Sequence, residues 1–228
     1  VVWTTAAGSK TTASFTPTAD SLLVVFSLFS AVDAASTISD SETGSWSQVG
    51  SLFSHSTSVA GTIGCYVRTT GVSGAAMTVT SAPGGTSTGG GLAVLELTGT
   101  LGYGTGAIRG SGGQADQASG GTPAPVISVT PDTTDAILSA VFDNTNGTAN
   151  AVPRTGYTEA YDQGFNNPAS GIEVNFRNSG ETSATITYGG TTPSQFGSFA
   201  CAVITPNPQT ATPDTLAQVL TLFVPAVI

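Results

Sequence analysis

The stretch FTPTADSLLVVFSLFSAV, residues 15–32, decides the fold of this chain. Its residues 22–26 form an uninterrupted apolar run of Leu, Val and Phe that follows a Thr-Pro pair. A short apolar run of this kind predicts a central strand that is covered on both faces of its sheet. The same arrangement returns at residues 129–146, VTPDTTDAILSAVFDNTN, where a second Thr-Pro pair precedes an apolar run.

Further blocks of the sequence repeat in the same order after these two stretches. GSW at Gly44 matches GYT at Gly156, CYVRTTGVSGAAMTVTS (65–81) matches VNFRNSGETSATITYG (174–189), and GGLAVLELTG (90–99) matches FGSFACAVITP (196–206). In this alignment Arg68 corresponds to Arg177 and Trp46 to Tyr157. Because the repeated unit is longer than the repeats of solenoids and propellers, it predicts two similar sets of antiparallel strands.

Short runs of β-branched and aromatic residues alternate with Gly, Pro, Ser and Asn along most of the chain, which is typical of strands joined by turns. Candidate strands lie at residues 11–16, 21–30, 46–54, 62–70, 76–82, 91–99, 124–130, 136–144, 157–163, 171–178, 183–189 and 197–206. We expect an all-β, antiparallel, jelly-roll-like β-sandwich over residues 1–206, with pseudo-repeated halves at 11–100 and 125–206. Two successive small sandwiches are the alternative, and we prefer one sandwich because no charged linker separates the halves.

Two segments fall outside this strand pattern. Residues 101–124 are rich in glycine and predict a surface loop that joins the halves. Residues 207–228 begin with spaced prolines, which predict an extended arm, and end in an apolar segment. We expect that segment either to dock on another subunit, by strand addition or groove insertion, or to fold back on its own sandwich. Its candidate docking residues are Leu216, Val219, Leu220, Leu222, Phe223 and Val224.

The charge balance argues against two classes of partner. The chain has 14 acidic residues against 5 Lys and Arg, which gives a net charge of −9. A chain of this sign lacks the basic surface that nucleic acids require, and anionic membranes repel it. Since its apolar runs are also too short to span a bilayer, we expect no membrane insertion. The sign of the net charge suits an extracellular protein that is kept soluble by mutual repulsion.

A search for catalytic or metal-binding patterns predicts none. His55 is the single histidine and is expected in a polar loop, without the partners of a Ser-His-Asp triad. Glu159 and Glu173 lie on candidate strands, but no two acids occupy alternate positions of one strand face, as a sandwich glycosidase would require. The loop acids near Asp40 and Asp143 lack EF-hand spacing. We therefore expect no enzyme activity, no cofactor and no metal.

A few buried groups are expected to have structural roles. Glu96 stands between Leu95 and Leu97, and we expect it to pair with Arg68 or Arg177 in a polar core. Cys65 and Cys201 lie in apolar runs and are interpreted as buried free thiols, with a disulfide as the alternative. For Trp46 and Tyr157, which occupy matching positions, core packing is preferred to sugar binding.

The pattern FTPTADSLLVVFSL, the turn from Ser41 to Trp46, CYVRTTGVSGAAMTVTS and LAVLELTG together resemble a β-sandwich found in structural proteins of tailed phages, of the minor tail and head-surface type. The resemblance covers residues 11–206 and carries over no catalytic residue. It implies a non-enzymatic structural protein of a virion surface, as a capsid decoration or tail module. Expected partners are other virion or filament subunits in a homo-oligomer. The alternatives are a carbohydrate-binding or adhesin module for a host-surface glycan, and a subunit of an extracellular filament.

Overall fold

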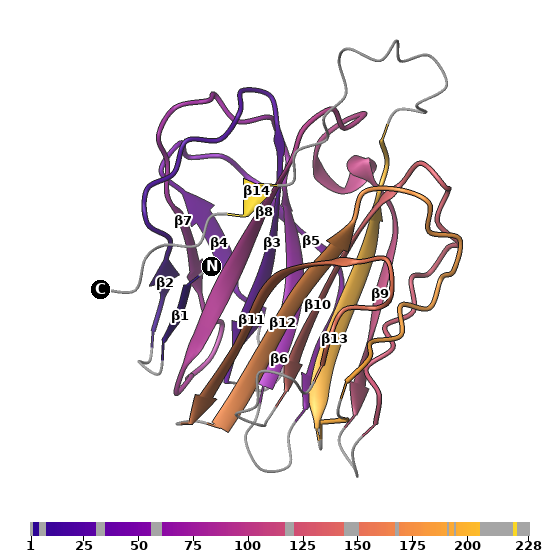
Figure 1. Cartoon of the computed structure of the whole chain (residues 1–228). Coiled ribbons are helices and arrows are strands. Elements are labelled where there is room, and N and C mark those ends of the chain that lie inside the picture. The colour runs from indigo at the N-terminus through magenta and orange to yellow at the C-terminus, as the bar shows by residue number, and fades with distance from the viewer. Residues whose placement is uncertain are drawn as a thin grey trace.

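The computed structural model describes residues 2–4, 8–30, 35–55, 61–116, 121–143, 151–166, 169–190, 192–193, 195–205 and 221–222. Within these ranges all the named strands pair antiparallel, and the one helical element is a short 3-10 turn, Gly104–Ala107 (η1) (Figure 1). Two large sheets pack against each other, so the predicted all-β antiparallel sandwich is confirmed. The described part of the chain contains no helix long and apolar enough to cross a bilayer.

The first half of the molecule comprises β1 to β8 in two sheets. Its main sheet has the order β1-β8-β3-β6-β5, and β14 also pairs with β8. The bounds of these strands are β1 Val2–Thr4, β3 Leu22–Phe29, β5 Trp46–His55, β6 Gly61–Arg68, β8 Gly90–Leu97 and β14 Thr221–Leu222. A smaller sheet, β2-β7-β4, is formed by Lys10–Thr11, Val79–Ala82 and Thr37–Asp40.

The second half comprises β9 to β13 in one sheet with the order β11-β12-β10-β13-β9. The bounds are β9 Ile108–Asp116, β10 Ala136–Asp143, β11 Thr158–Asn166, β12 Ala169–Arg177 and β13 Phe196–Val203. The place of the smaller sheet is taken by the single bridges Val126↔Thr185 and Val152↔Gly189.

The strand order of the two halves is the same. In the second half β9, β13, β10, β12 and β11 take the places that β1, β8, β3, β6 and β5 have in the main sheet of the first half. The segments at Val126, at Val152 and at residues 185–189 take the places of β2, β4 and β7 in the outer layer. This is the winding of a jelly roll, in which eight strands form two Greek keys. Each half therefore has the strand order of a jelly roll, and the two main sheets pack against each other around one core. The structure combines the two arrangements that the sequence left open.

Alternation along β3 explains why the apolar run at residues 22–26 is buried throughout. Leu22, Val24 and Phe26 face the central core between the two main sheets, whereas Leu23 and Val25 face the outer layer of the first half. In the central core, the ring of Phe199 from β13 lies 6.2 Å from that of Phe26 and 5.9 Å from that of Phe53. Burial of one such side chain contributes about 1.5–3 kcal/mol. The prediction of a strand covered on both faces is confirmed.

The segment predicted as a joining loop contains a full strand, β9, which pairs with β13 over most of its length. Its glycines reflect close packing, because a Cβ at Gly112 would clash with the carbonyl oxygen of Val126, and one at Gly113 with that of Ser198. Glycine content therefore concealed a strand whose neighbours leave no room for side chains. Because β9 occupies the place that β1 has in the first half, the second half begins at β9, before residue 125.

Two more predictions are decided by burial. His55 is fully buried at the end of β5, with its ring 5.4 Å from that of Phe142, so the expectation of a polar loop histidine is wrong. Cys65 and Cys201 are both buried in the central core as free thiols, as the preferred interpretation held. Burial and the adjacent Cys201 raise the pKa of Cys65.

Candidate functional site

The predicted pairing of Glu96 with Arg68 or Arg177 is wrong. An Oε1 atom of Glu96 accepts a hydrogen bond from the backbone N–H of Thr18 at 2.6 Å. Arg68 lies two strands away from Glu96, because β3 separates their strands. The guanidinium of Arg68 is instead engaged by two other acids, Asp40 and Glu42. Arg177 belongs to the other half.

Arg68 is instead part of a buried polar group at the rim of the first half. Its Nε lies 3.0 Å from Oδ2 of Asp40, and its Nη2 lies 2.9 Å from Oε2 of Glu42. The indole Nε1–H of Trp46 donates to the same Asp40 oxygen at 2.8 Å. An aromatic residue and an arginine therefore share one carboxylate, which fixes the turn at residues 40–46.

The second half repeats this arrangement with a different acid. The hydroxyl of Tyr157 donates to Oε2 of Glu181 at 3.0 Å, and Nη1 of Arg177 lies 3.4 Å from the same oxygen. Arg154 approaches the other oxygen of Glu181, with Nη2 at 3.6 Å from Oε1. Since Trp46 and Tyr157 both have their polar atoms engaged in this way, they serve the fold as rim residues, and the preference for packing over sugar binding agrees with the structure.

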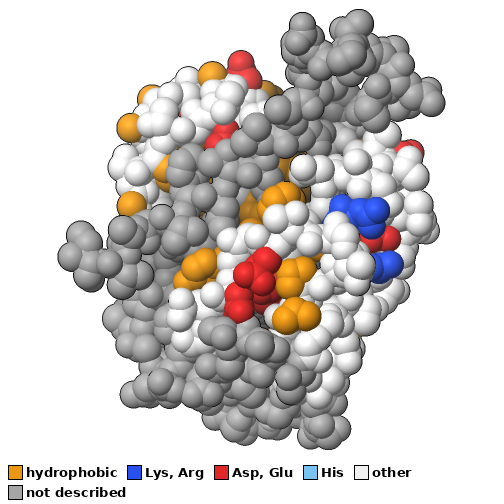
Figure 2. Space-filling view, viewed as in Figure 1, with side chains coloured by type: hydrophobic (Ala, Val, Ile, Leu, Met, Phe, Trp, Pro, Cys, Tyr) orange, Lys and Arg blue, Asp and Glu red, His pale blue; other side chains and the backbone are white. Residues whose placement is uncertain are grey.

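A cluster of three carboxylates lies on β11 and β12, and we call it the acidic cluster. It consists of Glu159, Asp162 and Glu173, each of which offers one oxygen within 4.8 Å of the others. In Figure 2 a red group with apolar neighbours stands over β11 and β12 at the centre of the visible face. The cluster combines an exposed residue, Glu159, with a half-buried Asp162 and a buried Glu173.

A β-bulge brings these side chains to one face. In β11, Glu159 and Asp162 are three positions apart, and a regular strand would direct them to opposite faces. The register with β12 shifts between Glu159 and Tyr161, so that Glu159 lies opposite Asn175 and Asp162 lies opposite Glu173. Bulges of this kind re-aim side chains and are frequent beside functional sites.

The electrostatics of the acidic cluster are unfavourable without a counterion. Burial, followed by the charges of Glu159 and Asp162, raises the pKa of Glu173 to about 9. Burial, Glu159 and Asp143 raise the pKa of Asp162 to about 6. Carboxylates that share a dry site repel one another and hold protons above their ordinary pKa. The cluster can relieve this repulsion by binding either protons or a cation.

Sequence reasoning considered Glu159 and Glu173 but missed the cluster. The search for acids at alternate positions within one strand could not find a group that is assembled across two strands and a bulge. The available signal was the pair of acids in YTEAYDQ followed by a further acid in GIEVNF. That signal becomes specific once the register between the two strands is known.

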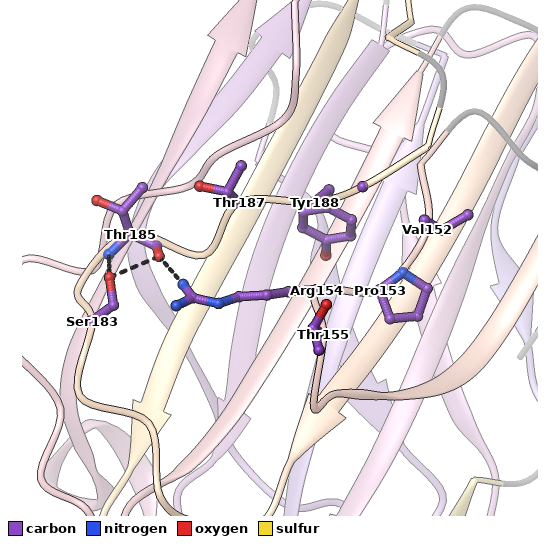
Figure 3. Close-up of a pocket in the computed structure, with 9 residues that line it drawn as sticks. Val152, Pro153, Arg154, Thr155, Ser183, Thr185, Thr187 and Tyr188 are labelled. Atoms are coloured by element: carbon purple, nitrogen blue, oxygen red, sulfur yellow. Dashed lines mark hydrogen bonds between the residues drawn. The ribbon is translucent and has the colours of Figure 1, made fainter.

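A surface hollow of ≈ 600 Å³ lies beside the outer layer of the second half (Figure 3). Its polar groups are largely engaged with one another: Nη1 of Arg154 donates to the carbonyl oxygen of Thr185, and the hydroxyls of Tyr188 and Ser139 are 2.5 Å apart. The ring of Tyr188 is buried and offers no exposed face for stacking on a sugar. The residues that line the hollow are Val152, Pro153, Arg154, Thr155, Ser183, Thr185, Thr187, Tyr188 and Gly189.

Most of the predicted docking segment lies outside the described residues. This applies to Leu216, Val219, Leu220, Phe223 and Val224. The remaining residue, Leu222, belongs to β14, whose backbone pairs with β8 opposite Leu95.

No protein family, no curated protein and no solved structure matches this chain.

Proposed function

We propose that the chain is a non-enzymatic structural protein of a particle surface, such as a virion, and that it acts through protein–protein contacts. The observation that supports this proposal is the incomplete edge of the first main sheet. Beyond β8 the sheet continues with two short terminal strands, β1 and β14, in place of one long strand (Figure 1).

The two terminal strands divide this edge between them. β1 pairs with residues 90–92 of β8, and β14 pairs with Leu95 and Glu96. A short terminal strand on a sheet edge forms few backbone hydrogen bonds, so an equivalent strand from another chain can replace it at small cost. Strand addition of this kind is a common way for extended segments to bind a folded domain.

The body behind this edge supports a structural role. Its two halves share one apolar core that contains residues from both main sheets. Protein interiors of this kind are close-packed and deform little, which suits a subunit that must hold a fixed position in an assembly. The resemblance to tailed-phage surface proteins and the net charge of −9 make a virion surface the most specific version of the proposal.

The proposal is tested by locating the partner of β14. In the double variant Leu95→Cys, Leu222→Cys the two substituted residues are partners in the antiparallel backbone register of β8 and β14, where a disulfide can form. Cys65 and Cys201 belong to the same buried core as Leu95, so both are replaced by alanine in this variant and in its control. If β14 exchanges between subunits, oxidation at high protein concentration should produce covalent dimers. Non-reducing electrophoresis and light scattering measure them.

The matched control is Leu101→Cys with Leu222→Cys, since Leu101 is exposed and is not paired with β14. It should yield little specific cross-link. A cross-link that remains intramolecular at every concentration, in a full chain that is monomeric by light scattering, would contradict the proposed contact.

A further inference from the structure

The acidic cluster contains buried polar groups that lack partners. Glu173 is 2% exposed, and neither of its carboxylate oxygens has a hydrogen-bond donor among the described residues. The side chain of Asn175 is fully buried beside Glu173 and Tyr188, and its amide oxygen and nitrogen have no hydrogen bond of normal length in the described part of the chain. Burying such a group without a partner is unfavourable, and more so when it is charged. Two of them side by side on one strand face indicate that a ligand belongs there.

The side chains of the acidic cluster and of Asn175 lie around one point on one face of the sheet. Glu173 and Asn175 are alternate residues of β12 and therefore face the same side of the sheet. The register sets Asp162 opposite Glu173 and Glu159 opposite Asn175, so the four side chains form a rectangle across two strands. The β12 side of this rectangle, Glu173 and Asn175, is buried, and on the β11 side the exposed Glu159 opens it to water.

The first half shows that the fold does not require these acids. The strand registers make Gln48, Leu52, Gly64 and Tyr66 the counterparts of Glu159, Asp162, Glu173 and Asn175. There the Tyr66 ring and Leu52 fill the space above Gly64, because a Cβ at Gly64 would meet Leu52 Cδ2 at 2.8 Å and Tyr66 Cε2 at 3.1 Å. The same place in the fold is thus closed by apolar contacts in one half and lined by oxygen atoms in the other.

We propose that Glu159, Asp162 and Glu173, together with the amide oxygen of Asn175, bind one calcium ion. Ca²⁺ takes six to eight oxygen ligands at about 2.3–2.6 Å, so oxygens on opposite sides of one ion are about 5 Å apart. The carboxylate oxygens of the acidic cluster lie within 4.8 Å of one another, which matches this spacing. Water completes the coordination on the side of Glu159.

The ligand set selects calcium over other divalent ions. The cluster offers oxygen donors and neither imidazole nor thiolate, which disfavours zinc and copper. Mg²⁺ requires near-octahedral geometry at about 2.0–2.1 Å and keeps several of its waters. Three carboxylates and an amide crowded on one strand pair suit the larger and less directional ion. This site is independent of the proposed strand exchange, since it lies on the second half, away from β8.

The test is calorimetric titration of the EDTA-treated full chain with calcium chloride, with magnesium chloride in parallel. We expect one saturable calcium site, weaker or absent magnesium binding, and a melting temperature higher by about 5 °C in saturating calcium. Glu173→Gln keeps the shape of the side chain and removes its charge, and it should weaken calcium binding by about tenfold or more.

The matched control is Asp132→Asn in the same half. Asp132 is an exposed acid whose Oδ1 accepts a hydrogen bond from the Thr134 N–H, which asparagine can also do, and it is not part of the acidic cluster. This variant loses the same charge and should bind calcium like the wild type. The absence of saturable calcium binding by the wild type would overturn the proposal. Equal affinity of wild type and Glu173→Gln would also overturn it, because such binding would reflect general attraction to a negative surface.

Discussion

The two halves of the molecule follow one strand order but complete their outer layers with different chemistry. In the first half the outer sheet β2-β7-β4 and the bridge Phe15↔Met77 beside it cover the main sheet with apolar side chains, among them Phe15, Met77 and Val79. In the second half single bridges replace that sheet, and the buried apolar residues split into two smaller clusters. The acidic cluster and the surface hollow both lie in the half with the reduced outer layer. In a duplicated fold, one half can therefore supply an apolar outer layer that stabilises the protein, while positions in the other half become available for polar groups that bind a ligand.

The central core should give the largest effect, because it belongs to both halves. Phe199→Ala removes a fully buried ring that contacts Phe26 and Phe53 across the two main sheets. We expect a loss of about 3–5 kcal/mol in the free energy of unfolding. Urea unfolding followed by circular dichroism should show one cooperative transition in wild type and variant. Two separate transitions would mean that the halves are independent domains.

The shared-carboxylate groups allow a direct comparison of the halves. Arg68→Ala should cost about 3 kcal/mol, because it leaves the fully buried side chain of Asp40 without its cation. Arg177→Ala should cost about 1 kcal/mol or less, since the Arg177 side chain is 30% exposed and Arg154 remains beside Glu181. The same urea measurement checks both variants. Equal losses would show that the two rims are energetically equivalent despite their different exposure.

The acidic cluster should make the metal-free protein sensitive to pH. The pKa of Glu173 is raised from 4.5 to about 9 by burial and by the neighbouring Glu159 and Asp162, so the folded state holds a proton that the unfolded state has lost. The contribution of Glu173 to stability should therefore be fully present below about pH 4.5 and be lost as the pH rises toward about 9. The groups that face Glu173 are Asp162 and Glu159 on β11, Asn175 on its own strand, and Tyr188.

Glu173→Gln isolates the contribution of that one carboxyl group. At pH 8 in EDTA the variant should exceed the wild type in stability by about 1–2 kcal/mol, because its folding requires no proton uptake by a carboxyl group that is ionised in the unfolded state. Melting temperatures across pH 4.5–9 measure the slope, and Asp132→Asn serves as the charge control. A wild-type slope that persists in Glu173→Gln would assign the pH dependence to other groups.

Much of the fold could be predicted from local patterns. The alternation of apolar and polar residues identified most strands, and the repeated Thr-Pro and apolar blocks identified the duplication. The strand β9 was not predicted because Gly112 and Gly113 have no side chains that could show an alternation of apolar and polar residues. The short β4 escaped because four residues, Thr37–Asp40, are too few to establish a period. The ion pairs were misassigned because the partners of Arg68 are Asp40 and Glu42, which the chain fold brings to it from a segment more than 20 residues earlier.

The sequence by itself determined the class of structure, since the period of two, the turn residues and the internal repeat are properties of short segments. It also determined that β3 is buried on both faces, because nothing along residues 22–26 can face water. The tertiary structure decided that the two halves share one core, and it decided where the acids meet. That outcome depends on cross-strand register and on one bulge at residues 159–161, which place residues distant in sequence on one face. A shift of one residue in register would have separated Glu159 and Asp162 from Glu173, and no local pattern encodes that choice.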